Sequence, residues 1–181
     1  MLQLFGEGDG EGIREAALFS DQQVDLNTPY FAAVSVTPAA SGPDSGTATF
    51  YLKNLSNDDE PIQVATIRHS ISSDVSNTVP LSLGFRTGSD DSFFDGLLDD
   101  IRLSSTALPV EQLLLTSEKP GPDTAGFWRF EPVPGIFEDS STHAVRLSAR
   151  RGNSTPATPA HAALADLCHV ILNSNEFLYV K

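Results

Sequence analysis

The chain has 181 residues, of which 40% are apolar, and its formal net charge is −13 at pH 7. A chain of this length can bury one ordinary hydrophobic core. The negative charge repels phosphate backbones, so nucleic acid and anionic membranes are poor partners. No stretch approaches the ~20 apolar residues of a membrane span, and we expect no membrane insertion. The single cysteine, Cys168, excludes a disulfide within the chain.

Short strands separated by turns are predicted in the first third of the chain. A strand over residues 2–5 is followed by the glycine-rich stretch 6–12. Residues 16–26 are mixed in character. Residues 30–36 are rich in β-branched, aromatic and small side chains, which favours a strand.

Residues 47–55 show the two-residue alternation of a strand with two different faces. The acidic turn at residues 57–61 and a second strand over 62–71 complete a predicted hairpin. The two faces of the first strand are expected to carry Ala48, Phe50 and Leu52 on one side, and Thr49, Tyr51 and Lys53 on the other.

Residues 97–103 predict another strand, followed by a short helical turn that places Leu113 and Leu114 beneath a sheet edge. The apolar residues of this strand change parity halfway along it. Either a bulge at Asp99 and Asp100 shifts the phase, or the strand is covered on both faces. We favour the bulge, because two adjacent carboxylates are costly to bury.

Residues 94–108 resemble the closing motif of laminin-G-like domains, which belong to the concanavalin A-like lectin/glucanase group. The stretch 126–147 resembles the opening strand of the same family, with an aromatic W-x-F strand and an acidic DSS turn. The residues that carry the first likeness are Phe94, Gly96, Leu98, Asp99, Asp100, Ile101, Arg102, Leu103 and Leu108.

This resemblance implies a mainly β fold, an antiparallel β-sandwich of the jelly-roll type over residues 1–149. The domain would be incomplete at its N-terminus. Residues 125–149, including strands at Trp128–Phe130 and Val145–Leu147, would return to the sandwich.

The tail has a different pattern, since its apolar residues recur at helical spacing. We expect a linker over 150–159 and a short C-terminal α-helix within 160–181. Residues 163–180 resemble the end of a C-terminal domain of unknown function in planctomycete-type, cytochrome-associated surface proteins. The likeness implies an extracytoplasmic or cell-surface location, a fragment of a longer parent, and a neighbouring helical domain as partner. We expect residues 163–180 to make few contacts with residues before Arg150.

Candidate site residues are few. The sandwich family commonly binds calcium, which takes oxygen ligands, and the resemblance makes acidic turns the candidate sites. Two aromatic residues, Tyr51 and Trp128, are candidates for stacking on a sugar ring, although Trp128 also suits a core position. His69 follows a strand and is interpreted as structural. The calcium candidates are Asp90, Asp91, Asp58 and Asp59.

The spacing of Glu7, Asp9 and Glu11 matches the E-x-D-x-E pattern of retaining glucanases with this fold. Such enzymes need two carboxylates held rigidly about 5 Å apart. Glycine spacers supply no packing to hold them, so a flexible loop is the expectation. We therefore expect no catalytic residues and no enzyme activity.

The sequence favours a non-catalytic recognition module that binds polysaccharide or a surface glycoprotein. A purely structural spacer between neighbouring domains is the alternative. A glycoside hydrolase is a third possibility that rests only on the glycine-spaced carboxylates and the fold, and a fold alone does not specify a function.

Overall fold

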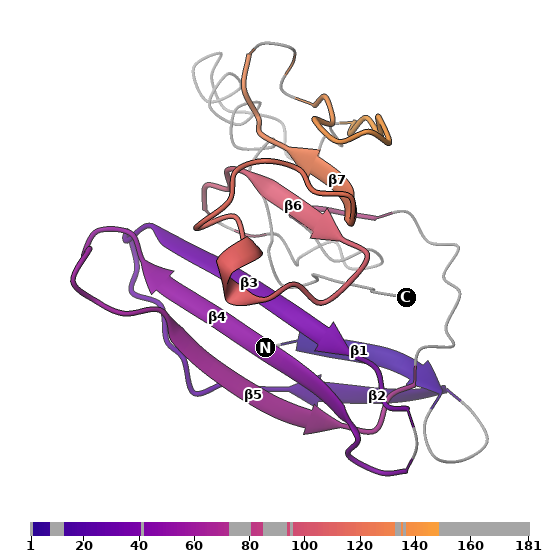
Figure 1. Cartoon of the computed structure of the whole chain (residues 1–181). Helices are drawn as coiled ribbons and strands as arrows, with labels where there is room; N and C mark the ends of the chain where they lie inside the picture. Colours follow the sequence, from indigo (N-terminus) through magenta and orange to yellow (C-terminus); the bar gives the residue numbers. More distant parts are fainter. Residues whose placement is uncertain are drawn as a thin grey trace, which may run out of the picture. The chain divides into compact units, whose positions relative to one another are not determined.

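The computed structural model describes residues 2–7, 13–40, 42–72, 81–84, 94, 96–132, 135 and 137–148. They belong to two compact units. The first contains strands β1 to β5 and the segment Ser105–Glu118, and the second contains the described residues between 81 and 104 and between 119 and 148. The described residues are mainly strands in antiparallel sheets of two, three and two strands (Figure 1). The predicted mainly β, antiparallel character is confirmed.

The first unit is built on the sheet β3–β4–β5. Strand β3 spans Tyr30–Thr37, β4 spans Gly46–Asn54 and β5 spans Gln63–His69. All three predicted strands and the hairpin are confirmed. The predicted alternation also holds, because Ala48 and Leu52 of β4 are buried and point to one face.

A second pair of strands, β1 (Leu2–Glu7) and β2 (Ile13–Leu18), forms an antiparallel hairpin in the same unit. Strand β1 is longer than the predicted 2–5 and includes Gly6. Strand β2 is missed by the sequence pattern, because IREAAL is mostly charged residues and alanine, which have low strand propensity. Pairing with β1 overrides that propensity. Residues 8–12 lie outside the described residues.

Leu18, at the end of β2, packs against one face of the three-stranded sheet. Each large apolar side chain that is fully buried there contributes about 1.5–3 kcal/mol to stability. The core cluster consists of the buried Leu18, Val36, Ala48 and Ile71, with the partly buried Val34, Phe50 and Ile67 around them.

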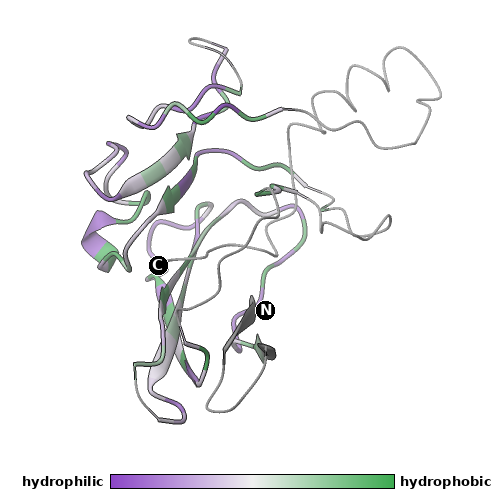
Figure 2. Cartoon of the chain, turned by 90° about the vertical axis from the view of Figure 1, so that its right-hand side faces the viewer, coloured by the Kyte–Doolittle hydropathy of each residue, from purple (hydrophilic) through white to green (hydrophobic). Residues whose placement is uncertain are grey.

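The opposite face of the sheet is covered near β3 by the segment Ser105–Glu118. The hydroxyl of Ser35 donates a hydrogen bond to the carbonyl of Leu108 at 3.3 Å. The predicted short helix is present as the single 3₁₀ turn η1, Val110–Gln112, which is mostly hydrophilic in Figure 2. Leu113 directly after it is buried, and Leu114 is half-buried.

The second unit contains β6 (Ile101–Ser104) paired antiparallel with β7 (Thr124–Trp128). The predicted strand over 97–103 therefore begins only at Ile101. The bulge predicted at Asp99 and Asp100 is wrong, since the register shift lies between Leu103 and Ser104. Asp100 instead has a left-handed backbone (φ 47°). Aspartate tolerates this conformation, which interrupts the extended chain directly before Ile101.

Asp139, in the predicted DSS turn, joins residues 139–145 to β7. Its Oδ1 accepts hydrogen bonds from the backbone N–H groups of Phe127 and Ser141, each at 2.8 Å. Its Oδ2 accepts the Ser141 hydroxyl at 2.7 Å and the Val145 N–H at 2.9 Å. The Phe127 carbonyl accepts the Ser140 N–H at 2.7 Å. The turn thus docks on β7 mainly through one carboxylate.

Two predictions in this region need correction. Residues 145–147 do not form a strand, because a side chain rather than a neighbouring strand takes the Val145 N–H. Phe130 lies beyond the end of β7 and has a left-handed backbone (φ 55°), so only Trp128 of the predicted pair is in the strand.

The predicted linker over 150–159 and the helix within 160–181 lie outside the described residues. Of the helices in the described part of the chain, none has the length and apolar character needed to cross a membrane.

Replacing Asp139 by alanine should destabilise the second unit by about 1–3 kcal/mol, because it leaves the buried Phe127 N–H without its acceptor. Trp128 is the single tryptophan and is buried, so its fluorescence during denaturant unfolding reports on this unit. Asp58→Ala, in the exposed β4–β5 turn, is the matched control. A change for Asp139→Ala no larger than for this control would contradict the assignment.

The contribution of Asp139 should also depend on pH. Burial alone raises the pKa of Asp139, but hydrogen bonds from Ser141, Phe127 and Val145 outweigh burial and hold the pKa below its ordinary value. A lowered pKa means that the stabilisation is present above the ordinary aspartate pKa of about 4 and is lost as the pH falls through the lowered value. The stability difference between the wild type and Asp139→Asn should therefore shrink on acidification. An unchanged difference down to about pH 2 would argue against this role.

Candidate functional site

One face of the three-stranded sheet points away from the core cluster and carries Tyr51. In the β4–β5 register, Tyr51 lies opposite Val64 and Thr49 lies opposite Thr66. Side chains alternate along a strand, so these residues share one face. We call it the Tyr51 face and define it as Thr47, Thr49, Tyr51, Lys53, Val64, Thr66 and Arg68.

The Tyr51 face is open on the β5 side. Val64 is 55% exposed, and Thr66 and Arg68 are also exposed. The hydroxyls of Thr49 and Thr66 lie 3.0 Å apart and share a hydrogen bond. The β3 side of the same face is where Ser35 holds the segment Ser105–Glu118.

The composition of the Tyr51 face suits binding rather than hydrolysis. Tyr51 is half-buried, so its ring is held by the sheet while part of it remains accessible. A tyrosine ring offers an apolar surface and a polar hydroxyl, a combination that suits ligands with both kinds of surface. None of the seven defining residues is a carboxylate, whereas glycoside hydrolysis normally requires a pair of them.

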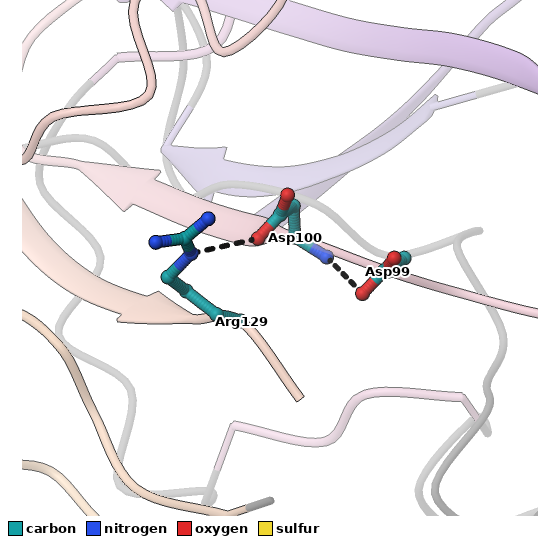
Figure 3. A network of polar contacts seen from close by, with 3 residues as sticks. All are labelled: Asp99, Asp100 and Arg129. Atoms are coloured by element: carbon teal, nitrogen blue, oxygen red, sulfur yellow. Dashed lines mark hydrogen bonds and ion pairs between the residues drawn. The ribbon is translucent and has the colours of Figure 1, made fainter. Parts of the chain in front are cut away.

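A second polar group of residues occurs in the second unit (Figure 3). The Nε of Arg129 lies 3.4 Å from Oδ1 of Asp100, and the Asp100 N–H donates to Oδ1 of Asp99 at 3.1 Å. The guanidinium of Arg129 also lies 5.8 Å from the ring centre of Phe127, within cation–π range. These contacts join the residue before β6 to the residue after β7.

The electrostatics of this group are those of a surface ion pair. Burial raises the pKa of Asp99, and the negative charges of Asp100 and Glu131 raise it further. The side chains of Arg129 and Asp100 are each 42% exposed. An exposed pair of this kind contributes about 0–1 kcal/mol. We therefore interpret it as a structural contact.

The two aromatic candidates have different environments. Tyr51 lies on the open sheet face described above. Trp128 is 2% exposed, and its indole N–H donates to the Val145 carbonyl at 2.8 Å. Its ring therefore belongs to the interior of the second unit, the core position that its residue type also suits.

The acidic candidates are not brought together. Asp58 and Asp59 lie exposed in the β4–β5 turn, where the Asp59 N–H donates to Oδ1 of Asn57 at 3.2 Å. Asp90 and Asp91 lie outside the described residues. In the part of the chain that the structure describes, no three His, Cys, Asp or Glu residues gather in a way that could hold a metal ion. Glu7 ends β1, while Asp9 and Glu11 lie outside the described residues.

The sequence did not predict the surroundings of two polar residues, Asp139 and His69. The DSS motif marked the turn but not the four hydrogen bonds that its carboxylate accepts. His69 was interpreted as structural, and it is 3% exposed at the end of β5. Only the register that places it opposite Gly46 reveals its packing.

Comparisons of the chain with protein-family models, with curated proteins and with solved structures found no match.

Proposed function

We propose that this chain is a non-catalytic recognition module of an extracytoplasmic protein, and that it binds polysaccharide or a surface glycoprotein through the Tyr51 face. In this proposal its antiparallel sheets belong to a laminin-G-like, concanavalin A-like β-sandwich. The location follows from the same family resemblance.

The observation that carries the proposal is the row formed on one sheet face by the half-buried Tyr51, the exposed Val64 and the paired threonines Thr49 and Thr66. The ring can stack on the apolar face of a sugar, and the threonine hydroxyls can exchange hydrogen bonds with sugar hydroxyls. The sheet holds these groups in fixed positions, which lowers the entropy lost on binding. The net charge of −13 favours a neutral polymer over a polyanion.

A structural spacer remains the second candidate. It is favoured by the Ser35–Leu108 hydrogen bond, through which the chain itself covers part of the sheet face. A spacer needs no open platform, so the two candidates differ in whether Tyr51 contacts a ligand.

A glycan array probed with the full chain tests the proposal, with and without calcium. We expect binding to neutral polysaccharides, and we expect Tyr51→Ala to weaken it by about tenfold or more, which corresponds to ~1.4 kcal/mol.

Tyr30→Ala is the matched control, because Tyr30 has the opposite parity in the same sheet and its hydroxyl contacts Asp25 instead. Thermal unfolding of both variants checks that they fold. Failure of the wild-type chain to bind any glycan would favour the spacer, as would equal binding by the wild type and Tyr51→Ala.

A further inference from the structure

His69 occupies a confined position at the end of β5. It is 3% exposed and lies opposite Gly46, the first residue of β4. A Cβ atom on Gly46 would come within 2.5 Å of Cε1 and 2.7 Å of Nδ1 of the imidazole. It would also come within 2.9 Å of the Ala39 backbone nitrogen. Glycine is therefore required at this position to make room for the ring.

The hydrogen bonds of the ring define its protonation state. Nδ1 of His69 accepts the backbone N–H of Ile71 at 3.2 Å, so Nδ1 carries no proton. The neutral ring then has its proton on Nε2. This atom is buried and has no hydrogen-bond partner among the described residues. The site thus fits an uncharged imidazole.

A change in the hydrogen bond between Ile71 and His69 would also affect the residues that Ile71 contacts. Its carbonyl accepts the Ala39 N–H at 2.9 Å, which ties the end of β5 to the chain that follows β3. Its side chain belongs to the core cluster with Leu18 and Val36. A proton added to Nδ1 would turn an acceptor into a donor that faces the Ile71 N–H.

We propose that His69 is a pH-sensitive contact: its neutral imidazole holds the Ile71 backbone in place, and protonation releases Ile71 in mildly acidic solution. The described charged group that acts on the ring is Asp44. Asp44 is itself held by Ser70, whose hydroxyl accepts the Asp44 N–H at 2.8 Å and donates to Oδ1 at 3.1 Å. Its carboxylate is the anion that a displaced imidazolium would meet.

The electrostatics agree with the geometry. Burial lowers the pKa of His69 from 6.5, and the backbone of Thr47, the charge of Asp44 and the backbone of Thr37 only partly oppose it. Because the folded pKa is the lower one, the unfolded chain binds the proton more readily. The stabilisation is complete above the ordinary histidine pKa and is lost as the pH falls through the lowered folded value.

Amide hydrogen exchange of the full chain, followed by NMR, tests the proposal. Protection factors are corrected for intrinsic exchange at each pH. Between about pH 7.5 and about pH 5, the protection of Ile71 and Ala39 should fall about tenfold, because the imidazole passes from its neutral to its charged form within the range in which histidine titrates. The fall should follow the chemical-shift titration of the His69 ring. The Phe127 amide, which is held by Asp139 in the other unit, serves as the internal reference.

Two variants at the contact, and one control variant, sharpen the test. Gly46→Ala should displace the ring and leave Ile71 poorly protected at both pH values. His69→Gln should remove the pH dependence, whereas His143→Gln, at an exposed position, should retain it. Constant protection of Ile71 in the wild type across this range would overturn the proposal. So would a His69 ring that titrates while Ile71 stays protected.

Discussion

The structure of the first unit depends on β4, because one face of this strand packs toward the core and the other carries residues of the Tyr51 face. Its even-numbered residues Ala48, Phe50 and Leu52 point to the core side, while its odd-numbered residues form the Tyr51 face. A shift of one residue in its pairing would exchange the two faces and expose the core side. Pairing with β3 on one edge and β5 on the other prevents such a shift. The same register therefore determines the core and the candidate binding surface.

The second unit uses a side chain where a larger sheet would use another strand. Its described strands form a two-stranded sheet, and a sheet of only two strands is by itself marginally stable in water. The Asp139 carboxylate satisfies three backbone N–H groups and one hydroxyl, and the Trp128 indole adds a bond to the Val145 carbonyl. Together these contacts hold residues 139–145 against β7, where Phe127 and Trp128 are buried. They give a physical reason for the aspartate at position 139 and for the serine at position 141.

The two proposals concern opposite parts of the same sheet. The Tyr51 face is an open surface on which a ligand can be held by a rigid ring and hydroxyls. His69 is an interior group, and its titration would alter the ends of β3 and β5 without removing any residue of the Tyr51 face. Acidification could therefore loosen the sheet end at Ile71 while the pairing of Tyr51 with Val64 persists.

Local pattern alone was sufficient to predict β3, β4, β5 and the face that carries Tyr51, because alternation and β-branched composition act within single strands. The local pattern also predicted the short helical turn before Leu113. The local pattern did not predict strand β2. It also failed to predict that the strand expected over 97–103 begins only at Ile101, and that Val145 lies outside any strand. Each depends on pairing with another segment of the chain or on a left-handed backbone, neither of which the pattern within a single strand encodes. The burial of His69 against Gly46 likewise arises from strand register, since residues 23 positions apart become neighbours only when the hairpin forms.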